Sequence, residues 1–264
     1  TYGSIAVVSS TGVWTYTLDN SDADTTALDA DDSVSDSFTL TVTDATTTDT
    51  DTMTVSITIT GANDATSAGA DQTGAITEDA STTTATGTVA GTDDDTDSAI
   101  TYAGDATGTY GALALTEATG AWVYTIDNTD SDTTALDADD SVSDAFTITA
   151  TDSDQSSSNT DTMTVTITIT GANDATSAGA DQTGAITEDA STSTATGTVA
   201  GTDADTDASI TYAAGSTAGT YGSLALTTSS GAWTYTLDNT DADTTALDAD
   251  DSVSDAFTIT ATDS

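Results

Sequence analysis

The stretch Thr160–Thr170, TDTMTVTITIT, alternates between apolar and polar side chains from Met163 onward. Its apolar residues are Met163, Val165, Ile167 and Ile169, with a threonine between each pair. A period of two residues with one polar face is typical of a half-buried strand in an antiparallel sheet. Threonine suits the other face because β-branched side chains pack well on a pleated surface. The stretch therefore predicts a β-strand.

Two further stretches in the same region show the same period. AWVYTID places Trp122, Tyr124 and Ile126 on one face, and SVSDAFTITATD, residues 141–152, places Phe146 and Ile148 on one face. Asp144 interrupts the second series, as do its copies Asp36 and Asp255, and we expect a β-bulge there. We expect the copies Trp14, Trp122 and Trp233 to pack in cores rather than to bind a ligand.

Seven strands are predicted between residues 64 and 173, and no segment shows a helical period. The predicted strands lie near residues 73–79, 84–91, 99–104, 109–116, 121–127, 142–151 and 161–170. Seven short strands in about 110 residues are typical of an immunoglobulin-like β-sandwich. The alternating Val and Ile residues are expected to fill its core together with Trp122, Tyr124, Tyr110, Phe146, Leu113, Leu115 and Leu136.

The sequence repeats itself with a period near 110 residues. GANDATSAGADQTGAITEDAST begins at Gly61 and again at Gly171, and TYG begins at Thr1, Thr109 and Thr220. Such a period suits a tandem array of autonomous domains better than a solenoid. We therefore expect residues 1–63 to be the C-terminal part of one repeat. Residues 64–173 form a complete repeat, and residues 174–264 form a third repeat that lacks its last strand.

The composition excludes several classes of function. The chain has 45 acidic residues and no Lys, Arg, His, Cys or Pro, and threonine fills 67 of its 264 positions. Nucleic-acid binding and polybasic membrane contacts need cationic side chains, so neither is expected. Disulfides, thiolate metal sites and protein salt bridges cannot form, and most catalytic templates lose a member. No apolar run is long enough to span a membrane.

The acidic residues cluster at the ends of the predicted strands. Like charges gathered at one end of a sandwich repel one another unless cations lie between them, and Ca²⁺ binds all-oxygen sites of six to eight ligands. An EF-hand beginning at Asp93 is rejected, because Ser98 replaces the turn glycine and Gly104 replaces the final glutamate. The alternative is that single aspartates are solvated turn residues. We prefer that alternative for the pairs Asp22/Asp24, Asp130/Asp132 and Asp241/Asp243.

Three stretches resemble a known family in order and spacing along the whole chain. They are GTYGALALTEATGAWVYTIDN, ALDADDSVSDAFTITATD and TMTVTITITGANDA. The chain resembles the VCBS repeats, cadherin-like or immunoglobulin-like tandem domains of large bacterial surface adhesins of the RTX-secreted type. The resemblance implies an all-β protein of seven-stranded antiparallel sandwiches joined end to end, with Ca²⁺ as cofactor.

The cadherin pattern implies a set of calcium ligands at each junction between repeats. For the junction between the second and third repeats these are Glu78, Asp137, Asp139, Asn173, Asp174, Asp203, Asp205 and Asp263. For the preceding junction they are Asp29, Asp31, Asn63, Asp64, Asp93, Asp95 and Asp152. The matching copies in the third repeat are Glu188, Asp248 and Asp250. The chain departs from the pattern where Gly171 replaces the first linker aspartate and Thr66 and Thr176 replace a proline, so we expect roughly one to three ions per junction.

The resemblance predicts structural extender repeats of an extracellular adhesin or fibre, stiffened by calcium. Its partners would be neighbouring repeats of the same chain or filament. One alternative is a threonine-rich module that binds a polysaccharide or ice, and another is a filament subunit linked by strand exchange. An enzyme is not expected, because the acidic residues recur alike in each repeat without a distinct cleft.

Overall fold

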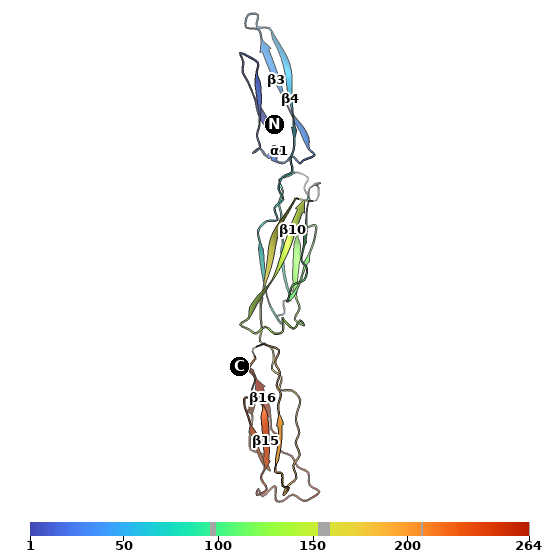
Figure 1. The fold of residues 1–264 in the computed structure, drawn as a ribbon, viewed down its shortest axis with the longest axis vertical. Helices are drawn as coiled ribbons and strands as arrows, with labels where there is room; N and C mark the ends of the chain where they lie inside the picture. The colour runs from blue at the N-terminus through green and yellow to red at the C-terminus, as the bar shows by residue number, and fades with distance from the viewer. Residues whose placement is uncertain (96–98, 153–158, 207, 264) are drawn as a thin grey trace. The chain divides into compact units, whose positions relative to one another are not determined.

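The computed structural model describes residues 1–95, 99–152, 159–206 and 208–263. The described residues form β-strands joined by turns, with one helical turn, α1 (Ala23–Thr26) (Figure 1). They fold into two compact units. One unit contains Thr1–Ile76, Thr82–Ile126 and Ser143–Thr168, and the other contains Thr77–Ser81, Asp127–Val142 and Ile169–Ser264. The middle repeat contributes to both units.

All seven strands predicted for the middle repeat are present. They are β5 (Gln72–Thr77), β6 (Thr84–Thr88), β7 (Ile100–Gly104), β8 (Gly111–Leu115), β9 (Ala121–Ile126), β10 (Ser141–Asp152) and β11 (Thr160–Thr170). One sheet has the order β5-β11-β10-β7 and the other has the order β6-β9-β8. The ladders of β10 with β7 and of β9 with β6 and β8 are antiparallel. The predicted all-β sandwich class is confirmed.

The inward faces of these two sheets form the core of the repeat. Trp122 and Tyr124 from β9 and Phe146 from β10 are buried. The rings of Tyr124 and Phe146 lie 5.9 Å apart between centroids. The indole N–H of Trp122 donates to Oε1 of Gln72 at 2.9 Å, so its polar atom is satisfied inside the core. The predicted packing in a core is confirmed for Trp122. It is wrong for Trp14, which is 42 % exposed, and Trp233 is half-buried.

Strands in the flanking repeats form where a partner strand is present. The first repeat contains the pairs β1 (Gly3–Val7) with β2 (Trp14–Leu18) and β3 (Ser33–Thr43) with β4 (Thr50–Thr60). The third repeat contains β12 (Thr194–Thr198), β13 (Thr211–Ala214), β14 (Gly222–Leu226), β15 (Ala232–Leu237) and β16 (Ile259–Thr262). Residues 182–187 repeat the sequence of β5 but form no strand. In the middle repeat β5 pairs with β11, and the 264 residues hold no third copy of β11.

The bulge expected at Asp144 and at its copy Asp36 was a wrong prediction, whereas the copy Asp255 precedes β16 and lies outside any strand. The register of β3 with β4 runs without interruption through Asp36, which faces Ile57. Along β10 the buried positions alternate regularly, and Asp144 takes one of them at 4 % exposure. The carboxylate is therefore a buried member of the inward face, and the alternation is not broken.

Hydrogen bonds to both oxygens explain how an acidic side chain can occupy this inward position. Oδ1 of Asp144 accepts from the backbone N–H of Thr109 at 2.8 Å. Its Oδ2 accepts from the backbone N–H of Tyr110 at 3.1 Å and from the hydroxyl of Tyr124 at 2.9 Å. Burial and this carboxylate raise the pKa of Tyr124 well above its usual value, so the phenol stays a donor. Asp144 thus ties the loop before β8 to strand β10.

Short polar turns connect the strands, and the aspartates in them behave as predicted. Oδ1 of Asp130 accepts from the backbone N–H of Asp132 at 2.8 Å, and Asp22 and Asp241 make the same contact two residues ahead. Asp22 thereby caps α1, a four-residue helix that the sequence pattern did not predict. These three carboxylates are occupied by local backbone donors, as expected of turn residues.

We expect Asp144→Asn to lower the free energy of unfolding by about 1.5–3 kcal/mol, because charge-assisted hydrogen bonds are lost and an amide N–H₂ faces buried donors. Urea titration followed by tryptophan fluorescence measures the change. Asp105→Asn is the matched control, since Asp105 is exposed, and it should leave stability unchanged. Equal stability of the two variants would show that the buried carboxylate does not hold this loop.

Candidate metal centre

Strand pairing in the third repeat brings three aspartates together. Asp203 and Asp205 lie in the loop that precedes β13, and Asp263 directly follows β16. Because β13 and β16 are antiparallel with Thr211 opposite Thr262, the residue after β16 lies beside the loop before β13. The three side chains each offer a carboxylate oxygen, and these oxygens lie within 4.8 Å of one another. This is the one group of three acidic side chains so close together in the part of the chain that the structure describes.

Protein donors hold all three carboxylates. Oδ2 of Asp203 accepts from the hydroxyl of Thr176 at 2.8 Å, and Oδ2 of Asp205 accepts from the backbone N–H of Asp174 at 2.9 Å. Oδ1 of Asp263 accepts from the backbone N–H of Ser209 at 2.9 Å. At least one oxygen of each carboxylate is thus held in place, and Oδ1 of Asp203 also accepts a longer bond of 3.3 Å from the N–H of Asp205.

Asp205 contains a buried side-chain oxygen that lacks a hydrogen-bond partner among the described residues. The residue is 6 % exposed, and this oxygen is its Oδ1. Burial raises the pKa of Asp205 above its usual value, the N–H of Asp174 opposes that shift, and the charges of Asp203, Asp137 and Asp263 add to it. A buried, unpaired carboxylate oxygen costs free energy unless a cation or proton joins it.

The donor set fits a hard divalent cation. The oxygens are carboxylates without any nitrogen or sulfur ligand nearby, since the chain has no His or Cys. Ca²⁺ prefers such all-oxygen sites and completes its shell of six to eight ligands with carbonyls and waters, whereas Mg²⁺ keeps more of its own waters. Asp203, Asp205 and Asp263 would hold the ion, and its charge would offset their mutual repulsion.

The middle repeat shows the same contacts around Asp93 and Asp95. The backbone N–H of Asp64 donates to Oδ2 of Asp95 at 2.8 Å, and the hydroxyl of Thr66 donates to Oδ2 of Asp93 at 2.8 Å. Asp152, the counterpart of Asp263, is 2 % exposed. Burial raises the pKa of Asp95, as it does for its copy Asp205. The local arrangement is therefore a property of the repeat.

Glu78 lies at the linker that follows β11. It is 3 % exposed, and its Oε1 accepts from the backbone N–H of Ala172 at 2.8 Å. Burial raises its pKa, the Ala172 N–H opposes that shift, and the charges of Asp174, Asp79 and Asp205 add to it. One of its oxygens is thus used to hold the linker backbone.

Close backbone packing explains why a glycine replaces the first linker aspartate. A Cβ atom at Gly171 would overlap the carbonyl oxygen of Asp137, and a Cβ at Gly61 would overlap that of Asp29 in the same way. The N–H of Gly171 donates to the carbonyl of Asp140 at 3.1 Å. A side-chain ligand at this position is therefore sterically excluded in both linkers.

The other ligands implied by the cadherin pattern lie outside the three-carboxylate group. Oδ1 of Asp137 accepts from the N–H of Ala138, and the buried Asp29 accepts from Ala30 in the same way. Four of these implied ligands are half-buried: Asn63, Asp64, Asp174 and Glu188. Five are exposed: Asp31, Asp139, Asn173, Asp248 and Asp250. Asp97, a further member of the acidic cluster at Asp93, lies outside the described residues.

Sequence reasoning missed three side chains at these positions. The hydroxyls of Thr66 and Thr176 contact the predicted ligands, and the amide of Asn159 donates to the carbonyl oxygen of Asp64. The recurrence of a threonine two residues after each Asn-Asp pair was the available signal. Its partner 27 residues away becomes visible only once the backbone is folded.

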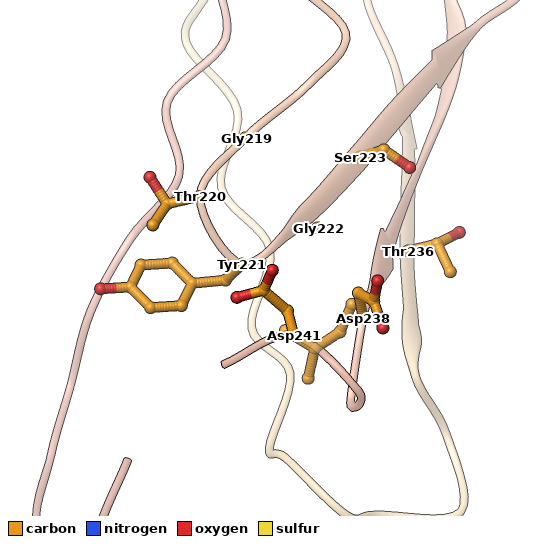
Figure 2. A pocket seen from close by; sticks show the side chains of 9 residues that line it. Gly219, Thr220, Tyr221, Gly222, Ser223, Thr236, Asp238 and Asp241 are labelled. Atoms are coloured by element: carbon orange, nitrogen blue, oxygen red, sulfur yellow. The ribbon is translucent and has the colours of Figure 1, made fainter. Parts of the chain in front are cut away.

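A second acidic location is the pocket of about 400 Å³ at the place where β14 begins and β15 ends (Figure 2). Asp238 and Asp241 line it, and a pocket of about 410 Å³ occupies the same place in the first repeat. Oδ1 of Asp238 accepts from the hydroxyl and the N–H of Thr240, which lower its pKa. These carboxylates are ordinary turn residues, and no buried unpaired side-chain oxygen is found there among the described residues.

Comparison with known proteins gives likenesses to cadherin fragments. No protein-family model matches the chain, and no curated protein matches it. The structure of mouse clustered PcdhgC3 EC1-3 is 20% identical, with 89% of this chain and 75% of that chain covered and a TM-score of 0.46. Drosophila N-cadherin EC1-4 is 17% identical, with 98% of this chain and 60% of that chain covered and a TM-score of 0.38. Mouse cadherin-23 EC22-24 is 15% identical, with 86% of this chain and 69% of that chain covered and a TM-score of 0.45. At these scores the fold assignment rests on the strand pairing described above.

In EDTA, we expect Asp205→Asn to raise the free energy of unfolding by about 1 kcal/mol, because it removes a buried charge from among like charges. The asparagine Oδ1 can still accept the N–H of Asp174. Thermal unfolding in EDTA and in millimolar Ca²⁺ measures the effect, and the gain from calcium should be smaller than in the wild type.

The control is Asp181→Asn, which removes an exposed charge from the same repeat. It should leave the stabilisation by calcium intact. If Asp205→Asn instead destabilised the chain in EDTA, the buried carboxylate would be satisfied without an ion.

Proposed function

We propose that the chain consists of extender repeats of a bacterial cell-surface adhesin or extracellular fibre, in which Ca²⁺ bound near the junctions between repeats stiffens the array. The observation that carries the proposal is the group of Asp203, Asp205 and Asp263, in which a buried oxygen of Asp205 has no hydrogen-bond partner among the described residues. The order and spacing of the VCBS-like stretches support the assignment to adhesin repeats.

The proposed mechanism acts through the linker from Ala172 to Thr176. The N–H of Ala172 is bound to Glu78, and the N–H of Asp174 is bound to Asp205. Without an ion, the acidic groups around the linker repel one another, and no cationic side chain offsets them. A bound Ca²⁺ converts this repulsion into attraction and restricts the linker. The repeats then transmit force along the array instead of bending at each junction.

The setting for this mechanism is outside the cell. Extracellular calcium modules bind at about 10⁻⁴–10⁻³ M, so external calcium fills them and the low calcium of a cytosol does not. The partners of each repeat are then its neighbours in the same chain or filament. None of the described helices is long and apolar enough to cross a membrane.

We expect millimolar Ca²⁺ to increase the maximum dimension of the chain in small-angle scattering and to slow amide exchange between Ala172 and Thr176. Both changes follow from the restriction of the linker, and EDTA should reverse them. Mg²⁺ at the same concentration should act more weakly, because it retains its waters.

The control for this experiment is Asp203→Asn combined with Asp205→Asn, which removes two of the three carboxylates. This variant should give the EDTA profile in both buffers. Identical scattering and exchange of the wild type in calcium and in EDTA would refute the proposed function.

A second candidate function has a specific observation in its favour. Strands β3 and β4 place six Ser or Thr pairs directly opposite each other on one exposed face, from Ser33 with Thr60 to Thr43 with Thr50. This face carries no carboxylate, although the chain has 45 of them. A charge-free hydroxyl surface suits a neutral partner such as a polysaccharide or ice.

We expect Thr41→Asp to abolish retention on neutral polysaccharide columns if this second function holds, because it places a charge in the middle of the hydroxyl face. Thr11→Asp adds the same charge in a turn outside the hydroxyl face and serves as the control. Passage of the wild type through such columns without delay, together with unaltered ice growth, would exclude this candidate.

A further inference from the structure

We propose that Thr176, and Thr66 in the preceding linker, are positioning residues of the cation site, whose hydroxyls select the aspartate oxygen that faces the ion. This inference rests on the proposed function, because Thr176 contacts the three-carboxylate group and Thr66 makes the matching contact with Asp93 in the preceding repeat. Neither threonine belongs to the ligand set that the cadherin pattern implies, and both stand where that pattern has a proline.

The backbone places Thr176 directly against the ligand loop. Ser177 and Thr202 form an isolated antiparallel bridge, with hydrogen bonds of 2.9 and 2.8 Å between their backbone groups. The residues that flank this bridge, Thr176 and Asp203, are therefore held side by side. The hydroxyl of Thr176 donates to Oδ2 of Asp203 at 2.8 Å. This contact joins the linker itself to the first carboxylate of the loop.

The hydroxyl fixes the rotation of the Asp203 carboxylate. A free carboxylate can present either oxygen, and holding one geometry costs side-chain entropy when the ion binds. With Oδ2 engaged by Thr176, Oδ1 is the oxygen left for the ion, and it already accepts a longer bond of 3.3 Å from the N–H of Asp205. Asp205 and Asp263 are oriented by backbone N–H groups, so Thr176 is the side chain that completes the arrangement.

The hydroxyl also lowers the electrostatic cost of the site before an ion arrives. A hydrogen bond to a carboxylate is stronger than one between neutral groups, so the hydroxyl offsets part of the repulsion between neighbouring carboxylates. A proline at this position has no donor to offer. In a chain without cationic side chains, a neutral hydroxyl is one of the few groups that can perform this task.

The contact recurs in the preceding linker with the same geometry. The hydroxyl of Thr66 donates to Oδ2 of Asp93 at 2.8 Å, and Ser67 forms the corresponding bridge with Thr92. Thr66 is 6 % exposed, so its hydroxyl needs this partner inside the fold. Both linkers contain the contact, so it belongs to the repeated sequence and not to one junction alone.

The test is calcium titration calorimetry on the whole chain with three double variants. Thr66→Val with Thr176→Val removes both hydroxyls at nearly constant volume, and Thr66→Ser with Thr176→Ser restores them. Ser67→Ala with Ser177→Ala is the matched control, because the hydroxyls of these neighbours accept from Gly69 and Gly179 and do not contact a ligand. Thermal unfolding in EDTA shows whether each variant folds.

We expect the valine variant to bind Ca²⁺ about tenfold more weakly, the serine variant to recover most of the affinity, and the alanine control to match the wild type. Equal affinity of the valine variant and the wild type would overturn the inference while leaving the proposed function intact. A lower melting temperature in EDTA with unchanged affinity would overturn it as well, since the hydroxyl would then be structural only. A wild type that binds no calcium would refute the proposed function itself.

Discussion

The absence of every cationic side chain is the constraint on which the rest of this structure depends. The chain carries 45 carboxylates and no Lys, Arg or His, so no buried carboxylate can be neutralised by an ion pair with a side chain. Each must be satisfied by N–H and O–H donors, be exposed to water, or recruit a cation from solution. The position of each acidic residue in the fold follows from which of these solutions is available there.

Two kinds of buried aspartate show the difference. Asp144 receives three donors that occupy both of its oxygens, so these hydrogen bonds offset its burial inside the sandwich and tie a loop to β10. Its copy Asp255 has matching donors: burial acts to raise its pKa, but the N–H groups of Thr220 and Tyr221 and the hydroxyl of Tyr235 outweigh that effect. At Asp205 one oxygen remains without a donor among the described residues, and its pKa is raised. The unpaired oxygen at the second kind of position supports the proposed cation site, whereas both oxygens of Asp144 already have donors.

The sequence pattern predicted strands such as β9, β10 and β11 well, because apolar and polar side chains alternate along each of them with a period of two residues. The bulge that it predicts at Asp144 is wrong, because the donors that satisfy this carboxylate come from Thr109, Tyr110 and Tyr124 in other segments. The clustering of acidic residues predicted only a region near the strand ends, and the cadherin pattern named the three converging aspartates among eight residues for the junction between the second and third repeats. Which carboxylates converge depends on the pairing of β13 with β16, and the role of Thr176 depends on a bridge that the sequence does not reveal. The partition into three repeats remains a prediction.

The central claim is that a divalent cation completes the group of Asp203, Asp205 and Asp263. The most direct measurement is a crystal structure of the chain grown in millimolar Ca²⁺, with anomalous scattering used to locate the ion. We expect a calcium peak bound by oxygens of these three residues at about 2.3–2.6 Å, including Oδ1 of Asp205. A well-ordered site in which Oδ1 of Asp205 instead accepts a hydrogen bond from water, with no anomalous peak beside it, would show that no cation completes the group.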